Sequence, residues 1–330
     1  MARMARLKLT GTAAWYHVHC RTAGRKGSYP LMNVLCQRKM TALLKFLSGV
    51  YCCEIAAFCV MGNHYHLIIK FNRARRLDKA ELFRRALLLY PKSEKYLRLW
   101  REKKWDQFNK RIYDLSEYMR NFQALFARWY NKTYERRGRF WGDRFKSVLL
   151  EDYRAVMDCM LYVDLNPVRA GLVTRPEEWR YSSIYYRMAG LDGWLIALRE
   201  LLSEEYAHKK ASEEEVLTDY RQRLYYRGNI ATQDMELFEE DGKELRPKKE
   251  LISDEILASE KSRGFKVRGM YGRQLRYFAD GIALGGEGFI RQIIQRLRDE
   301  GRYIRRQHPI DQVVDTHKTV REQRSHAVVF

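Results

Sequence analysis

The most constraining feature of the sequence is a pair of β-strand patterns separated by a turn signal. Residues 51–61 form a nearly continuous apolar run rich in β-forming side chains, which is typical of a buried strand. Gly62-Asn63 follows as a turn signal, and residues 64–71 then resume a strand pattern. Because so short a turn joins the two strands, they are predicted to form an antiparallel hairpin.

Further periodic segments extend this hairpin into an α+β pattern. Strand patterns cover residues 14–21 and 144–150, and helical patterns cover residues 32–47, 116–135 and 152–166. The resulting order, β-α-β-β-α-β-α, predicts a ferredoxin-like split βαβ fold with a central antiparallel sheet and one added helix.

The domain organisation follows from changes in composition along the chain. We expect residues 1–190 to form one domain, with a charged helical insertion at about 73–113 on the outside of the sheet. Residues 191–262 are predicted to be a helical, charged linker region, and residues 263–330 a small helical C-terminal region with a loose tail. Two short helices joined around Gly285-Gly286 would form either a helix-turn-helix or a hairpin that packs on the body.

The charge balance favours a polyanionic partner. Lys and Arg outnumber Asp and Glu by 62 to 41, the formal net charge is +21, and the first fifty residues contain no acidic side chain. Phosphate neutralisation by such a surface supplies most non-specific nucleic-acid affinity, although a basic surface could also dock on anionic lipid. The sequence therefore favours a DNA-binding or RNA-binding protein.

The cysteines and the apolar runs indicate a cytoplasmic protein. The six cysteines show neither CxxC spacing nor the rhythm of a disulfide module, so they are expected to be reduced and mostly buried. We identify no signal peptide and no run approaching the roughly 20 apolar residues of a membrane span. We expect no membrane partner.

Two histidine pairs have the spacing of a metal site on a strand. His64 and His66 lie two residues apart, so their imidazoles point to the same face of the predicted strand. Two imidazoles on a rigid sheet can hold a divalent ion that polarises a phosphate. His17 and His19 have the same spacing on the first strand, and spacing alone does not choose between the pairs. Structural histidines are a further alternative, and one strand could lend a residue to the other's site.

Four sequence segments together carry a family resemblance. They are CVMGNHYHLII, LSEYMRNFQALFARWYNKTYERRGRFWGDRFKSVLLED, MLYVDLNPVRAGLV and EEWRYSS. In this order they resemble the REP-associated tyrosine transposases, which are single-tyrosine HUH (IS200-like) transposases. The resemblance covers residues 10–190, and RYFADGIALGGEGFIRQII is similar to a C-terminal extension of some members. Gly62 departs from the proline that the family usually has before Asn-His.

The resemblance implies a set of site residues. It places the metal pair at His64 and His66, with Mg²⁺ or Mn²⁺ as the ion, and the nucleophile at Tyr162. It also favours Asn166, one helical turn beyond the tyrosine, as a third metal ligand. Tyr153 and Asp158 lie on the same predicted helix as rivals for the two roles.

A basic, aromatic loop leads into the strand at 144–150. Its arginines and lysine are candidates for phosphate contacts, and its tryptophan could stack on a base. Phe140 and Phe145 are expected to stabilise the fold. Arg169, which follows the tyrosine, is another candidate phosphate contact. The DNA-binding set is Arg137, Arg139, Trp141, Arg144, Lys146 and Arg169.

The expected function is that of the family. It is a metal-dependent single-stranded DNA endonuclease and strand transferase that acts through a 5′-phosphotyrosine. Its expected substrate is DNA with hairpin-forming, REP-like repeats. We expect it to work as a monomer or a homodimer in the bacterial cytoplasm, with the nucleoid. A metal-dependent nuclease that uses water would share the histidines without needing the tyrosine. A domesticated DNA-binding regulator would need only the basic surface. The sequence contains no phosphate-binding glycine loop and no convincing acidic trio, which argues against nucleotide hydrolysis and a three-carboxylate transposase.

Overall fold

The computed structural model describes residues 6–9, 11–25, 27–202, 211–229, 252–262, 281–302 and 318–320. The chain divides into two compact units. The first comprises Met1–Leu150 with Gly193–Ile196, and the second comprises Glu151–Asp192 with Ala197–Phe330. This division groups residues 151–190 with the C-terminal part, whereas the sequence pattern grouped them with residues 1–150.

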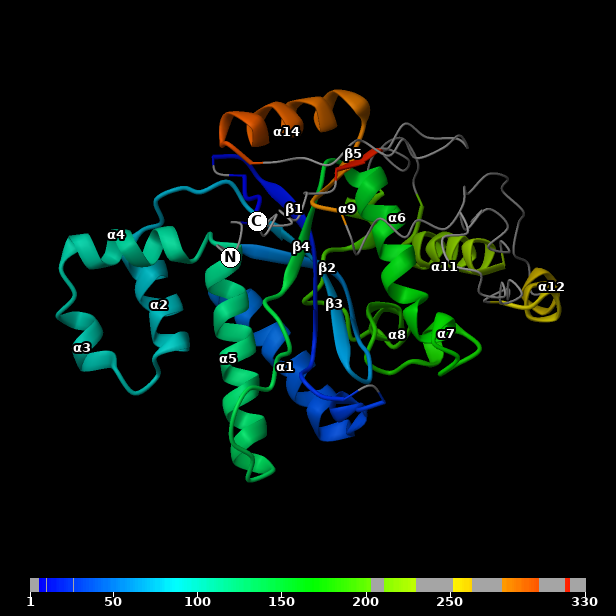
Figure 1. Cartoon of the computed structure of the whole chain (residues 1–330), viewed down its shortest axis with the longest axis horizontal. Coiled ribbons are helices and arrows are strands. Elements are labelled where there is room, and N and C mark those ends of the chain that lie inside the picture. The colour runs from blue at the N-terminus through cyan, green and yellow to red at the C-terminus, as the bar shows by residue number, and fades with distance from the viewer. Residues whose placement is uncertain are drawn as a thin grey trace, which may run out of the picture. The chain divides into compact units, whose positions relative to one another are not determined.

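The first unit is built on four antiparallel strands (Figure 1). They are β1 (Ala14–Arg21), β2 (Cys53–Val60), β3 (His64–Phe71) and β4 (Lys146–Leu150). In space they run β2-β3-β1-β4, with each neighbour antiparallel. Helix α1 (Val34–Val50) connects β1 to β2, and α5 (Leu115–Thr133) lies between β3 and β4 in the chain. The predicted α+β class and the split βαβ strand order are both present.

One face of this sheet packs against α1 and α5. The ring of Tyr65 on β3 contacts Phe122 of α5 edge to face, with centroids 5.3 Å apart, and Gln123 Nε2 donates to the Tyr65 hydroxyl at 3.2 Å. The hydroxyl of Tyr118 in α5 donates to the carbonyl of Leu44 in α1. Because strand residues alternate between faces, the residues on either side of Tyr65 point to the opposite face.

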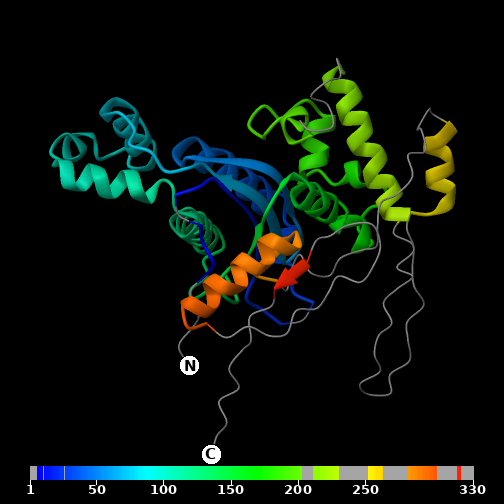
Figure 2. The ribbon, with the colours of Figure 1, turned by 90° about the horizontal axis from the view of Figure 1, so that it is seen from above.

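The predicted insertion forms three helices, α2 (Lys79–Leu89), α3 (Glu94–Arg98) and α4 (Glu102–Arg111). Figures 1 and 2 both show them as a group beside the sheet. Arg85 anchors α2 by donating to the carbonyls of Val50 and Tyr51 at 2.8 and 3.0 Å. The insertion is therefore a packed subdomain of the first unit.

The second unit contains most of the remaining helices. Its described elements are α6 (Tyr153–Asp164), α7 (Asn166–Arg169), α8 (Ser183–Met188), α9 (Leu198–Leu201), α11 (Glu213–Asn229), α12 (Asp254–Ser262), β5 (Ala283–Gly285), α14 (Glu287–Asp299) and β6 (Lys318–Val320). Helix α11 lies in the predicted linker but buries Tyr220 and Tyr225, so it belongs to the core of this unit.

The prediction of two helices joined around Gly285-Gly286 is wrong for the end of the first helix. Residues 283–285 are strand β5, which pairs with β6, and only the second half is a helix, α14. The rest of the expected first helix, residues 265–280, lies outside the described residues.

A buried carboxylate holds three helices of the second unit together. Asp164, at the end of α6, is fully buried and accepts hydrogen bonds from Ser183 Oγ and the Tyr220 hydroxyl, both at 2.7 Å. These donors come from α8 and α11. Burial raises the pKa of Asp164 to about 6, although the two hydrogen bonds and Arg187 act in the opposite direction.

Replacing Asp164 with Asn is expected to remove a pH-dependent part of the stability. Between the ordinary carboxyl pKa of 3.8 and the folded value of about 6, the folded chain retains a proton that the unfolded chain has released. Stabilisation is therefore full at low pH and is lost as the pH rises through the folded pKa of about 6, by roughly 1 kcal/mol between pH 5 and pH 7.5. Urea denaturation of wild type and Asp164→Asn at both pH values measures this loss. A stability difference between the two proteins that does not change with pH would contradict the assignment.

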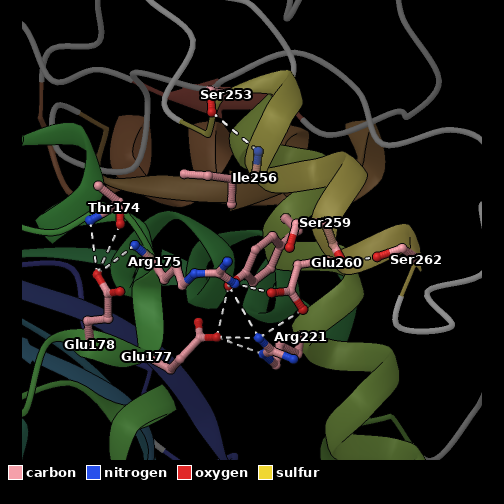
Figure 3. Close-up of polar contacts among 11 residues, drawn as sticks. Thr174, Arg175, Glu177, Glu178, Arg221, Ser253, Ile256, Ser259, Glu260 and Ser262 are labelled. Carbon is pink, nitrogen blue, oxygen red and sulfur yellow. Dashed lines mark hydrogen bonds and ion pairs between the residues drawn. The ribbon is translucent and has the colours of Figure 1, made fainter.

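A second buried carboxylate ties α12 to the same unit (Figure 3). Glu260 is fully buried and forms ion pairs with Arg175 and with Arg221, the latter at 3.1 Å. Arg221 also binds Glu177, which accepts a hydrogen bond from the Tyr225 hydroxyl at 2.9 Å. Leaving a buried charge without its partners is costly, so this network fixes α12 against α11.

Candidate functional site

The register of β1 and β3 brings both histidine pairs onto one face of the sheet. His19 lies directly opposite His66, and Arg21 lies opposite His64. Directly opposed residues share a face, as do residues two apart on one strand. The pairs that the sequence presented as rivals therefore form a single cluster of four histidines, on the face opposite to the one that α1 and α5 cover.

The imidazoles of this cluster are closely packed. His17 Nε2 lies 2.9 Å from His66 Nδ1, so one of these nitrogens donates to the other. The ring centroid of His66 is 5.1 Å from that of His17, 5.7 Å from that of His19 and 5.1 Å from that of His64. His17 and His66 are buried, whereas His19 and His64 are half-buried.

Local contacts fix which nitrogen of each β3 histidine could bind a metal. Asn63 Oδ1 lies 2.8 Å from His64 Nδ1 and can only accept, so His64 carries its proton on Nδ1. His66 Nδ1 is engaged by His17. His64 Nε2 is then a candidate ligand atom. His66 Nε2 is one in the tautomer whose Nδ1 donates to His17 Nε2, and a ligating histidine is ordinarily oriented through its other nitrogen in this way.

The protonation of His64 suits a ligand. Burial, together with the positive charges of Arg21 and His19, lowers the pKa of His64 to about 4. The imidazole is therefore neutral near pH 7, as a metal ligand must be. Within the described residues, no group of three or more His, Cys, Asp or Glu side chains is arranged to hold a metal ion. A divalent ion bound by the two β3 histidines would therefore need its remaining ligands from other groups.

Two cations share the histidine face. Lys146, at the start of β4, lies opposite His19, and the row across the sheet is Cys59, His66, His19 and Lys146. Arg21 lies opposite His64. Both cationic side chains are exposed. A phosphate near the histidines would therefore meet positive charge from two other strand positions.

Tyr162 lies on α6 in the second unit, and Arg169 covers its ring. The guanidinium carbon is 4.5 Å from the ring centroid, and the tyrosine is half-buried. Burial lowers the pKa of Arg169, while the Tyr162 side chain raises it. The buried Nε of Arg169 has no hydrogen-bond partner within the described structure. A cation beside a phenol favours the phenolate, and an unsatisfied guanidinium nitrogen is suited to an anion.

The side chain of Asn166, the first residue of α7, bonds the end of the preceding helix α6. Its Nδ2 donates to the carbonyl oxygen of Tyr162 at 2.9 Å, and the residue is buried. The amide nitrogen is thus occupied at the end of α6, and Oδ1 is the only atom that could serve the predicted metal role.

Tyr153 and Asp158, the alternatives on α6 for the nucleophile and the third metal ligand, have different surroundings. Tyr153 is the first residue of the helix and is half-buried. Asp158 raises the pKa of Arg227, a buried residue of α11, although burial has the larger effect and lowers it. Arg169 also lowers the pKa of Arg227, so Asp158 and Arg169 are both near enough to Arg227 to affect its charge.

The predicted DNA-binding loop separates into exposed cations and a buried ring. Arg137, Arg139 and Arg144 are exposed and form no ion pair within the described residues. Trp141 is only 9% exposed, and its Nε1 donates to the carbonyl of Gln123 at 3.0 Å. Its ring packs on Tyr65 and on two phenylalanines. The structure therefore places Trp141 in the core, which corrects its predicted role in stacking a base.

Sequence reasoning missed two cations of these sites. Arg21 joins the histidine face only through the pairing of β1 with β3, although its alternation with His17 and His19 was a usable signal. Arg227 lies in the segment predicted to be a linker, and no local pattern marks it as buried.

The comparisons with known proteins include a distant structural likeness. No protein-family model matches the chain, and no curated protein matches it. Among solved structures, a REP-associated tyrosine transposase bound to a REP hairpin is similar over 58% of this chain and 88% of its own length, with 17% sequence identity and a TM-score of 0.39. A likeness at this TM-score assigns neither fold nor function to this chain. Separately, no described helix combines the length and apolar character needed to cross a membrane.

Proposed function

We propose that this protein is a metal-dependent single-stranded DNA endonuclease and strand transferase of the single-tyrosine HUH class. The observation that supports this best is the histidine face of the sheet. There His64 and His66 both have Nδ1 engaged, and Lys146 and Arg21 lie on the same face. Such a face suits a divalent ion together with a phosphodiester.

The metal ligands in this proposal are His64 Nε2 and His66 Nε2, with Asn166 Oδ1 as the third. A bound Mg²⁺ or Mn²⁺ would supply Lewis-acid polarisation of the scissile phosphate. Lys146 and Arg21 would hold non-bridging phosphate oxygens by charge-assisted hydrogen bonds. The remaining phosphate contacts are assigned to Arg137, Arg139, Arg144 and Arg169. Trp141 is left out because it is buried.

Tyr162 is the proposed nucleophile. Its phenolic oxygen, after losing its proton, forms a bond to phosphorus, and the bond to the 3′-oxygen breaks with its electron pair. The products are a 5′-phosphotyrosine and, once the leaving oxygen takes up a proton, a free 3′-hydroxyl. Attack of a 3′-hydroxyl on the phosphotyrosine reverses these bond changes and joins strands. Arg169 positions the phenol and favours its ionised form.

The proposed substrate is single-stranded DNA that folds into hairpins, as in REP-like repeats. This choice rests on the sequence segments that resemble the REP-associated tyrosine transposases. The same proposal places the protein in the bacterial cytoplasm with the nucleoid, as a monomer or a homodimer.

A covalent-adduct assay tests the proposal. Wild-type protein is mixed with 5′-labelled and 3′-labelled hairpin DNA that carries single-stranded flanks, with Mg²⁺, with Mn²⁺ or with EDTA. We expect an SDS-stable adduct to the 3′-labelled fragment only, and only with metal. Cleavage without an adduct would contradict the tyrosine mechanism in favour of a nuclease that uses water. Binding without cleavage in either metal would contradict the enzyme proposal in favour of a regulator.

A further inference from the structure

The insertion of the first unit has an aromatic core of its own. Trp105 and Phe108 are buried between its helices, and Trp100 contacts both rings at centroid distances of 4.9 and 5.8 Å. Leu82, Ala86 and Leu97 complete this core. Because packing inside the insertion is already satisfied, its outer surface is available for another role.

That outer surface is strongly basic. Residues 73–111 contain fourteen Lys and Arg but only five Asp and Glu. Several of the cations are paired with these carboxylates, including Arg98 with Glu94 at 2.7 Å and Lys79 with Glu102 at 3.0 Å. Five exposed cations of α3, α4 and their flanks form no ion pair within the described residues: Lys92, Lys95, Arg101, Lys103 and Lys104.

Two large apolar side chains lie among these five cations. Tyr96 is 71% exposed and Leu99 is 76% exposed, which are the two highest values among the large hydrophobic residues of the described chain. The ammonium of Lys104 lies 5.0 Å from the ring centroid of Trp100, and the Arg98 guanidinium lies 5.4 Å from that of Phe83. The rings of Tyr96 and Trp100 thus alternate in sequence with cations along this segment, which we call the insertion tip (residues 92–104).

A shallow pocket adjoins the insertion tip. It is lined by Lys79, Phe83, Leu97, Arg98 and Trp105. Two of these residues are aromatic and two are cationic, so the pocket combines a flat apolar wall with positive charge. Two residues of the tip, Leu97 and Arg98, therefore line a hollow that carries positive charge.

We propose that the insertion tip is a second binding surface for single-stranded DNA, outside the histidine face. Tyr96 would stack on an unpaired base, and the five unpaired cations would contact the phosphates on either side. Base stacking on an exposed ring and a basic track are the two elements of single-strand binding. The choice of DNA, as the single-stranded flank of a hairpin, rests on the proposed function.

The composition of the tip argues for this occupant. An acidic peptide would be held by the cations but would give no reason for an exposed tyrosine among them. An anionic membrane would require a continuous apolar face, whereas α3 has only five residues and charged side chains on both sides of Tyr96. Unpaired bases use both features at once.

The test measures binding of the full-length protein to two fluorescent DNA probes in EDTA, so that no cleavage step contributes. One probe is a hairpin with a single-stranded flank, and the other is the same hairpin with blunt ends. Tyr96→Ala is expected to weaken binding of the flanked hairpin about tenfold or more and to leave binding of the blunt hairpin unchanged. Tyr96→Phe keeps the ring and should bind both probes as wild type does.

A charge-reversal pair tests the phosphate contacts. Lys92→Glu combined with Lys95→Glu should weaken binding of the flanked hairpin and reduce the slope of log K against log salt by about 1.4, the value for two single-strand phosphate contacts. Lys110→Glu is the matched control, because it is an exposed, unpaired lysine of the same insertion beyond the tip.

Two outcomes would overturn the proposal. One is that the tip variants bind the flanked hairpin as tightly as Lys110→Glu does. The other is that Tyr96→Ala weakens both probes equally, since the ring would then not be stacking on an unpaired base. Binding is measured without metal, so it does not depend on the proposed catalytic function. A failure of that function would appear only in the adduct assay, and a failure of the tip proposal only in the binding assay.

Discussion

Replacing Tyr162 with Phe is expected to lower the rate at which the covalent protein–DNA adduct forms by at least about a thousandfold. The phenolic oxygen is the only atom removed, and in the proposed mechanism it is the atom that bonds to phosphorus. The ring and its contact with the Arg169 guanidinium at 4.5 Å remain, whereas the hydrogen bond between the Tyr162 and Arg169 side chains is lost. Circular dichroism checks that the variant is folded. The measurement is single-turnover adduct formation on a labelled hairpin, followed by denaturing electrophoresis.

Tyr153→Phe is the matched control for this experiment. Tyr153 lies on the same helix and is also half-buried, so the two substitutions are chemically alike. Tyr153→Phe should leave the adduct intact. An adduct that persists in Tyr162→Phe but disappears in Tyr153→Phe would move the nucleophile to the start of α6.

The second large effect is expected at the metal ligands. His64→Ala and His66→Ala should each lower Mn²⁺ affinity at least about tenfold and reduce cleavage about a hundredfold or more, because each removes one of two imidazole ligands. Isothermal titration calorimetry with Mn²⁺ alone measures the affinity, and circular dichroism checks that the variants are folded.

The neighbouring strand supplies the controls. His17→Ala should weaken Mn²⁺ binding by a smaller factor than His66→Ala does, since His17 acts only by orienting His66 through the 2.9 Å contact. His17→Gln keeps a polar group near His66 Nδ1 and should recover part of the loss. If His17→Ala or His19→Ala abolishes Mn²⁺ binding while His64→Ala does not, the ligands are on β1 and the assignment to β3 is wrong.

The strands and the main helices could be predicted because their signals are local. The alternation at residues 14–21 and the Gly62-Asn63 turn defined β1 and the β2-β3 hairpin, which the structure places within two residues of the predicted bounds. The same period of two put His64 and His66 on one face without further information. These features depend on a residue and its immediate neighbours.

What could not be predicted depends on pairings between distant segments. That His19 faces His66 follows from the register of β1 with β3, which no local pattern specifies. Trp141 stands among arginines in the sequence, and only its packing under α5 shows that it is a core residue. Residues 213–229 fell within the predicted helical, charged linker region, because the partner of Tyr220, Asp164, lies 56 positions earlier and no local pattern reveals it.

The central position of β1 also has a consequence for the order in which the site assembles during synthesis. β1 pairs with β3, which follows after one helix and one strand, and with β4, which follows only after the insertion and α5. A nascent chain that has emerged as far as Phe71 can pair β1 with β3 and align its four histidines. Lys146 joins them only after a far longer loop has closed, and closing longer loops costs more entropy. The chain would therefore assemble the proposed metal-binding face well before it acquires the full positive charge proposed to hold DNA there.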